Sequence, residues 1–252
     1  AGEKWETLIA EKAEVLEYVV LAGNHLLAQY MVDATNRIYT CDLQGKFINE
    51  VQLPGLGTIT GLNGERMDNT VFYGFTSFTS PLSIYSYDVA ENTQAEFFKP
   101  ALDFDASNYV IRQVFYESKD KTSIPMFIVH KKGLVFDGNN PAMLYGYGGF
   151  NASLTPNFSL SRLVFLENGG VFCMANLRGG GEYGEQWHEA GTKLNKQNVF
   201  DDFIAAAQFL ISEKYTSSEK LAIAGGSNGG LLVGACMTQR PDLFKVCLPA
   251  VG

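Results

Sequence analysis

The chain has 252 residues, of which 46% are hydrophobic and 18% are charged, a composition typical of packed globular domains rather than of disordered protein. Its net charge of −8 at pH 7 argues against a nucleic-acid or anionic-membrane partner, because both attract basic surfaces. No apolar run reaches the roughly 18–20 residues that are needed to span a bilayer.

The cysteines are widely scattered, at Cys41, Cys173, Cys236 and Cys247. They form no C-x-x-C pair and no cluster with histidine, so we expect neither a metal site nor any other cofactor. Free buried thiols in a reducing compartment are the simplest interpretation. We therefore expect a cytoplasmic location, with the periplasm as the alternative.

Residues 1 to about 100 predict two sets of four short β-strands separated by turn-forming residues. The first set comprises Glu17–Leu21, Leu26–Val32, Ile38–Leu43 and Phe47–Leu53. The second set comprises Gly57–Leu62, Val71–Thr76, Ile84–Val89 and Ala95–Phe98. The third strands of the two sets match closely at a spacing of 46 residues. Four strands in a repeat of about 40–50 residues are typical of a β-propeller blade.

Two blades cannot close a ring, since propellers typically have about 4–8 blades. The propeller interpretation therefore expects further blades before this chain. The alternative is a small β-sandwich of eight strands, which the same periodicity allows.

A different pattern begins near Asp105, so we place the domain boundary between residues 104 and 105. An antiparallel strand pair is expected first, at Gln113–Glu117 and Met126–His130. Apolar strands then alternate with helices, which predicts a doubly wound and mostly parallel sheet. The expected strands are Ala142–Tyr147, Val171–Asn176, Leu221–Ala224 and Lys245–Ala250, and the expected helices are Asp201–Glu213 and Gly230–Gln239.

The turn before the last helix reads G-x-S-x-G, from Gly225 to Gly229. This is the nucleophile-elbow pattern of serine hydrolases, in which a sharp strand-to-helix turn holds the serine hydroxyl clear of the fold. Ser227 is therefore the candidate nucleophile. The alternative is an ordinary strand-to-helix turn that contains a serine.

A serine nucleophile needs a histidine base and a carboxylate, which follow the serine in this order of elements. The sequence ends 25 residues after Ser227, and that segment contains no histidine. Its one acid, Asp242, comes too early to lie on a later strand. His188 precedes the serine, so we expect it to be a structural or surface residue.

Two other polar segments have simpler explanations than catalysis. Arg178–Gly181 lacks the lysine and hydroxyl residue of a phosphate-binding loop, and we expect a backbone turn at the end of a strand. Asp201 and Asp202 are expected to open a helix, where negative charge suits the positive end of the helix dipole.

Three segments closely resemble the prolyl oligopeptidase family: residues 144–151 (LYGYGGFN), 176–184 (NLRGGGEYG) and 225–232 (GGSNGGLL). Residues 239–244 (QRPDLF) fit as well. The GGSNGG elbow is more typical of this family than of oligopeptidase B, dipeptidyl peptidase IV or acylaminoacyl peptidase.

The resemblance implies an α/β-hydrolase domain capped by a propeller. Residues 1–104 would then be the last propeller blades, and residues 105–252 the first half of the hydrolase domain. It also implies a serine peptidase that cleaves short peptides on the carboxyl side of proline. Its expected partners are short proline-containing peptides and the rest of its own polypeptide.

The resemblance assigns roles to four residues. Ser227 would be acylated, and the backbone N–H of Asn228 and the hydroxyl of Tyr147 would bind the oxyanion. A pre-aimed donor of this kind is worth roughly 3–4 kcal/mol in the transition state. Phe150 would lie near the pocket for the proline ring. The alternatives are a core position for Tyr147, with its hydroxyl bonded to the backbone, and plain packing for Phe150.

The family's catalytic Asp and His, most of its proline pocket and a substrate-binding arginine lie beyond Gly252. We therefore expect the chain to be an internal segment of a longer peptidase, with negligible activity alone. Two other functions remain open. One is an esterase or lipase-like hydrolase, and the other is a non-catalytic protein that binds a partner through its blades.

Overall fold

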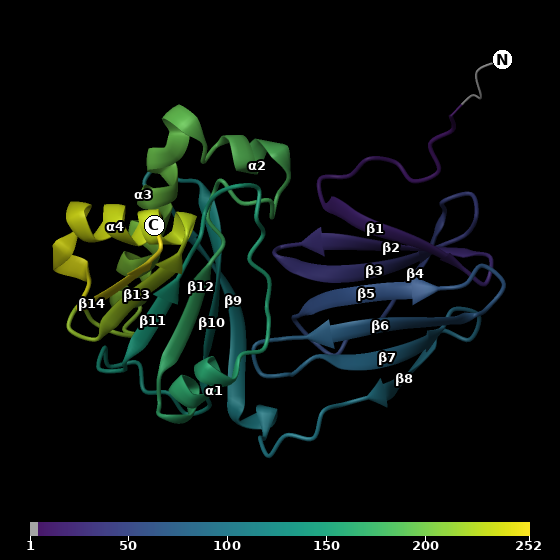
Figure 1. Ribbon diagram of the computed structural model, residues 1–252, viewed down its shortest axis with the longest axis horizontal. Coiled ribbons are helices and arrows are strands. Elements are labelled where there is room, and N and C mark those ends of the chain that lie inside the picture. Colours follow the sequence, from purple (N-terminus) through teal and green to yellow (C-terminus); the bar gives the residue numbers. More distant parts are fainter. Residues whose placement is uncertain (1–4) are drawn as a thin grey trace. The chain divides into compact units, whose positions relative to one another are not determined.

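The computed structural model describes residues 5–252, which form two compact units (Figure 1). The first unit extends to Leu102 and also includes Pro156–Phe158. The second unit comprises Asp103–Thr155 and Ser159–Gly252. The division thus falls two residues before the boundary expected from the sequence. Within the first unit, the Thr58 hydroxyl donates a hydrogen bond of 2.6 Å to the Pro156 carbonyl of this short segment.

The first unit contains two antiparallel four-stranded sheets. In each sheet, neighbouring strands are also consecutive in the sequence. The strands of the first sheet are β1 (Val15–Ala22), β2 (His25–Val32), β3 (Thr35–Cys41) and β4 (Phe47–Glu50). Those of the second are β5 (Thr58–Gly64), β6 (Thr70–Thr76), β7 (Ser83–Asp88) and β8 (Thr93–Phe98). The turns before β4 and β8 contain Gly45 and Asn92 in the left-handed region, which explains why turn-forming residues occur there.

One hydrophobic core joins these two sheets. Leu27 and Ile38 of the first sheet and Val71 and Tyr73 of the second are fully or almost fully buried in the same cluster. Successive side chains of a strand point to opposite faces, so each sheet presents one apolar face to the other.

The second unit is built on a mixed six-stranded sheet with the order β14-β13-β11-β12-β10-β9. Its strands are β9 (Tyr109–Glu117), β10 (Ser123–Lys131), β11 (Ala142–Tyr145), β12 (Val171–Ala175), β13 (Leu221–Gly226) and β14 (Val246–Ala250). The four strands from β11 to β14 pair in parallel, whereas β9 and β10 form an antiparallel hairpin at one edge. The expectation of a largely parallel sheet after an antiparallel pair is confirmed.

The longer helices are α1 (Leu160–Glu167), α3 (Lys196–Ser212) and α4 (Asn228–Gln239), and α2 (Glu185–Glu189) is a single short turn. The buried core on one face of the sheet includes Cys173 together with Phe203 of α3 and Leu232 of α4. Phe172, the neighbour of Cys173, instead stacks under Arg162 of α1, so α1 covers the opposite face. Among residues 5–252, no helix is both long and apolar enough to cross a bilayer.

The start of α3 corrects the sequence analysis. The helix begins at Lys196, five residues before the expected start, and Asp202 lies inside it with no exposed surface. Asp202 accepts hydrogen bonds from Arg178 Nη2 at 2.6 Å and from the Ser118 hydroxyl at 2.6 Å. Asp202 is therefore an ion-pair partner in the core rather than a residue that favours the helix dipole.

The Arg178 guanidinium is the centre of a buried polar network. It pairs with Asp202 on α3 and, at 2.5 Å, with Asp120 in the turn between β9 and β10. Burial by itself lowers the pKa of Arg178, but hydrogen bonds to the two carboxylates outweigh it and raise that pKa. The bond from Arg178 lowers the pKa of Asp120 to about 2. The network therefore ties the turn after β12 to a helix and to a hairpin.

Replacing Asp202 with alanine should lower the free energy of unfolding of the second unit by about 3–5 kcal/mol, because it leaves the buried Arg178 charge without its main partner. The matched control is Asp201→Ala. Asp201 pairs at 3.7 Å with the exposed Lys119, and loss of such a surface pair costs about 0–1 kcal/mol. Chemical denaturation of the complete protein measures both changes. Equal losses for the two variants would contradict the assigned role of Asp202.

Candidate active site

Ser227 forms the turn between β13 and α4, and its side chain is exposed. Its backbone has φ 56° and ψ −121°, a conformation that L-residues rarely adopt and that costs about 1–3 kcal/mol. Hydrogen bonds hold it there: the Ser227 N–H donates to the Ala250 carbonyl at 2.8 Å, and the Ser227 carbonyl accepts from the Gly230 N–H at 2.8 Å. The expected strand–turn–helix context of the G-x-S-x-G pattern is present.

The glycines of the elbow are required by the close approach of strand and helix. A Cβ on Gly229 would lie 2.7 Å from the Gly146 carbonyl oxygen, and one on Gly230 would lie 2.5 Å from the Ala250 carbonyl oxygen. A Cβ on Gly225 would clash with the Gly229 carbonyl. Each contact is with backbone, which cannot rotate away as a side chain can. Small residues therefore surround Ser227 for steric reasons.

Tyr147 lies beside this elbow. It follows β11 by two residues, and β11 pairs in parallel with β13, so both strands end at the same edge of the sheet. The Tyr147 carbonyl accepts a hydrogen bond of 2.6 Å from Asn228 Nδ2. Its half-buried ring lies against the first turn of α4, where a Cβ on Gly229 would be 3.7 Å from Tyr147 Cδ2. The fold thus brings together Ser227, Asn228 and Tyr147.

Phe150 is 79% exposed and has φ 54°, and Asn151 after it has φ 55°. The turn is fixed by the Asn151 N–H, which donates at 3.1 Å to the Gly179 carbonyl. Phe150 does not pack into the core of the unit. Instead it lines a pocket of about 710 Å³ together with Asn228 and Leu231 from the start of α4.

His188 lines the same pocket, which its position in the sequence did not predict. Its Nδ1 lies 2.8 Å from the Gly179 carbonyl oxygen and 3.1 Å from the Asn151 backbone nitrogen. These backbone contacts fix the ring on the turns that border the pocket.

Lys196 is a site residue that the sequence analysis missed. Its Nζ donates hydrogen bonds to the Gly148 carbonyl at 2.7 Å and to Asn228 Oδ1 at 3.1 Å. Burial lowers the pKa of Lys196 below its ordinary value. From the sequence alone, a lysine at the first turn of a helix is expected to be exposed. No local pattern indicates that its ammonium reaches the elbow.

The 176–184 segment supports the turn that carries Phe150. Glu182 is almost fully buried, and its Oε1 accepts hydrogen bonds from the Leu154 N–H at 2.9 Å and from Asn176 Nδ2 at 3.1 Å. Burial raises the pKa of this carboxyl. The segment therefore has a structural role beside the site. This agrees with the sequence analysis, which expected a backbone turn there and not a phosphate-binding loop.

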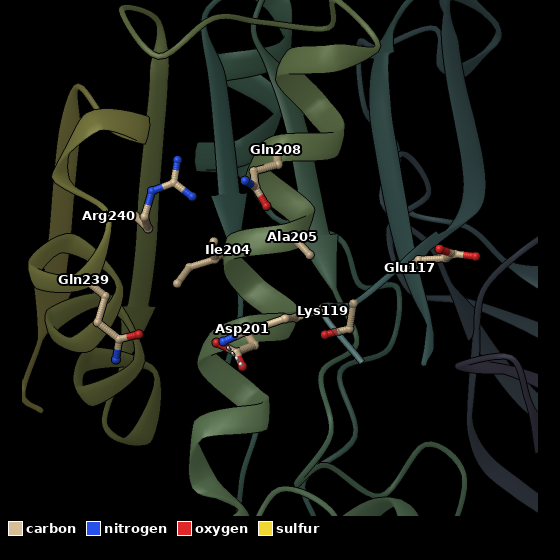
Figure 2. A pocket seen from close by; sticks show the side chains of 9 residues that line it. Glu117, Lys119, Asp201, Ile204, Ala205, Gln208, Gln239 and Arg240 are labelled. Carbon is tan, nitrogen blue, oxygen red and sulfur yellow. Dashed lines mark ion pairs between the residues drawn. The ribbon is translucent and has the colours of Figure 1, made fainter. Parts of the chain in front are cut away.

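A second pocket, of about 420 Å³, lies over α3 and contains none of the candidate site residues (Figure 2). Its lining is mostly polar and includes Glu117, Lys119, Asp201, Gln208, Gln239 and Arg240. The Lys119–Asp201 ion pair spans part of it. Within residues 5–252, no three His, Cys, Asp or Glu side chains are grouped so as to hold a metal ion.

A comparison of two glycines on α4 tests the steric requirement. Gly229→Ala should destabilise the second unit by about 1–3 kcal/mol, because its Cβ meets the Gly146 carbonyl. Gly234→Ala on the same helix meets nothing within 4 Å and should stabilise it by about 0.5–1 kcal/mol. Thermal unfolding midpoints of the two variants of the complete protein should shift in opposite directions. A shift in the same direction would show that close approach does not determine the glycine at 229.

The sequence is similar over its whole length to named relatives. The prolyl endopeptidase of Elizabethkingia meningoseptica is 49% identical over 251 residues, which is 100% of this chain and 36% of that relative. The prolyl endopeptidase of Dictyostelium discoideum is 45% identical, over 99% of this chain and 33% of that relative. The chain therefore spans about a third of the length of these curated relatives.

Solved structures agree with the sequence relatives. One, from a study of inter-domain dynamics in two prolyl endopeptidases, matches with a TM-score of 0.87 and 50% identity, over 93% of this chain and 35% of that chain. Another is prolyl oligopeptidase B of Galerina marginata bound to a 25mer macrocyclization substrate, with a TM-score of 0.86 and 37% identity. That match covers 92% of this chain and 33% of the other.

Two family models match separate parts of the chain. The prolyl oligopeptidase N-terminal β-propeller domain matches residues 1–99, which confirms that the two four-stranded sheets are propeller blades and not a sandwich. The prolyl oligopeptidase family model matches residues 156–252, which include the elbow, and confirms an α/β-hydrolase fold. The chain belongs to the prolyl oligopeptidase family.

Proposed function

We propose that the complete protein is a serine peptidase that cleaves short peptides on the carboxyl side of proline. The observation that carries this proposal is the strained, exposed Ser227 at the elbow, beside Tyr147 at the same edge of the sheet. Family membership supports the choice of a peptide substrate over a simple ester. A bound 25mer substrate in the Galerina marginata relative supports a peptide of limited length.

In the proposed reaction, Ser227 Oγ attacks the carbonyl carbon of the proline residue, and its proton passes to a histidine base. That proton then goes to the leaving amine as the peptide bond breaks, and water hydrolyses the acyl-enzyme. We assign the base and its carboxylate to residues beyond Gly252. His188 is not assigned as the base, because it precedes Ser227 in the chain, whereas the base of α/β-hydrolases follows the serine.

We assign the oxyanion to two donors, the backbone N–H of Asn228 and the hydroxyl of Tyr147. Asn228 is the first residue of α4, so its N–H has no acceptor within the helix and lies at the positive end of the helix dipole. Tyr147 is tied to Asn228 through its carbonyl. Phe150, exposed at the pocket, is the proposed contact for the proline ring.

Ser227→Ala should abolish hydrolysis of a blocked proline anilide, with a loss of kcat of about 10⁴-fold or more, because no acyl-enzyme forms. A fluorophosphonate should label the unaltered protein and not the variant. Ser161→Ala, at an exposed serine of α1, serves as the control and should leave both signals unchanged. Cleavage of a simple ester without cleavage of the anilide would instead favour an esterase. Absence of labelling in the unaltered complete protein would favour a non-catalytic role.

Tyr147→Phe tests the second oxyanion donor. We expect kcat to fall by about 10²–10³-fold with little change in KM, since the hydroxyl would act in the transition state. Fluorophosphonate labelling should slow rather than disappear. If Tyr147 is instead a core aromatic whose hydroxyl bonds only to backbone, the variant should keep normal kcat and show a lower thermal midpoint.

We also propose a cytoplasmic location and no nucleic-acid or membrane partner. The acidic composition and the scattered cysteines support this proposal. Fractionation of the source cells decides between cytoplasm and periplasm.

A further inference from the structure

A chain of three hydrogen bonds connects the first turn of α3 to the elbow. Lys196 Nζ donates to Asn228 Oδ1 at 3.1 Å, and Asn228 Nδ2 donates to the Tyr147 carbonyl at 2.6 Å. Lys196 Nζ also donates to the Gly148 carbonyl at 2.7 Å. The lysine therefore holds both the Asn228 side chain and the turn that follows Tyr147.

The surrounding backbone leaves this arrangement little freedom. The Asn228 amide lies so close to Gly149 that a Cβ there would be 2.5 Å from Asn228 Nδ2. Gly148 has φ 62°, and a Cβ on it would clash with Val199, one turn after Lys196 on α3. The turn at Tyr147–Gly149 is thus clamped between α3 and the start of α4.

Both proposed oxyanion donors belong to residues that these contacts hold, namely Asn228 and Tyr147. The Asn228 side chain ties the start of α4 to the Tyr147 carbonyl, and Lys196 holds the Gly148 carbonyl, so these bonds hold the backbone that carries both donors. An oxyanion hole works because its donors are already aimed when charge develops, and displacement by about 1 Å costs up to 10²-fold in rate.

We infer that Lys196 is a positioning residue for the oxyanion hole, acting through the Asn228 side chain and the Gly148 carbonyl. Its side chain also lines the pocket that contains Phe150, so the test separates this positioning role from substrate binding by measuring kcat and KM apart. This inference rests on the proposed peptidase function of Ser227. The acceptors of Lys196 are a carbonyl and an amide oxygen, so its ammonium charge also strengthens both bonds.

The test is Lys196→Met in the complete protein, which keeps the side chain's length and removes its donors. We expect kcat for a proline anilide to fall by about 10- to 100-fold with KM changed less than about threefold. Affinity for a proline aldehyde, which forms a tetrahedral adduct on the serine, should fall in proportion to kcat. Lys196→Arg, which keeps charge and N–H donors, should recover part of the loss. Lys220→Met, at an exposed lysine before β13, should leave all these values unchanged.

A double-mutant cycle that combines Lys196→Met with Asn228→Ala tests whether Lys196 acts through the Asn228 side chain. Asn228→Ala removes the side-chain amide and retains the backbone N–H that binds the oxyanion. Because both changes break one hydrogen-bond chain, the double variant should lose clearly less activity than the product of the two single losses. Fully multiplicative losses would overturn the inference that Lys196 acts through Asn228.

A purely structural role gives a different result and also overturns the inference. Lys196→Met would then lower the thermal midpoint and the fraction of sites titrated by a fluorophosphonate, while kcat per titrated site and aldehyde affinity stay normal. Failure of the proposed function itself is separate, because the unaltered protein would then neither cleave the anilide nor react with the fluorophosphonate.

Discussion

The close approach of backbone segments around Ser227 is the constraint on which the site depends. The start of α4 lies against the turn after β11 and against the end of β14, with carbonyl oxygens where a Cβ on Gly229 or Gly230 would have to be. Only this spacing lets the serine occupy its strained turn with its hydroxyl exposed, since its own N–H bonds to Ala250 and its carbonyl bonds to Gly230. The strained backbone conformation of Ser227 is thus maintained by the packed segments on both sides of the turn.

Side-chain contacts also connect the site to the core of the second unit. Arg178 and Asp202 fix the turn after β12 to α3, and α3 in turn presents Lys196 and Val199 to the turn that carries Tyr147. A buried ion pair of this kind adds little stability over an apolar replacement, but removal of one partner is costly because it leaves the other charge buried and unpaired. The Tyr147 donor therefore sits on a turn held by a long helix, and the Asn228 donor is the first residue of α4.

Strands were predicted more accurately than helices, for reasons visible in particular residues. The blade strands are short strand-forming segments between turn-forming residues, and β11 to β13 are apolar runs, so both signals are local to the chain. The helix α1 was missed although Ser159 caps it and Gly169 follows it with φ 83°, because eight residues show little periodicity. The start of α3 was placed too late because Asp201 and Asp202 resemble a helix opening, whereas Asp202 is buried against Arg178.

The sequence by itself determined the repeat of four strands, the largely parallel sheet and the elbow at Ser227, because periodicity and glycine spacing are local properties. It also indicated Tyr147 and Phe150 through a family motif. Only the tertiary structure decided that Lys196 reaches Gly148 and Asn228, and that Asp202 pairs with Arg178. These contacts join residues 24 to 48 positions apart. Such pairs are set by how helices pack on the sheet, which no local pattern in the chain encodes.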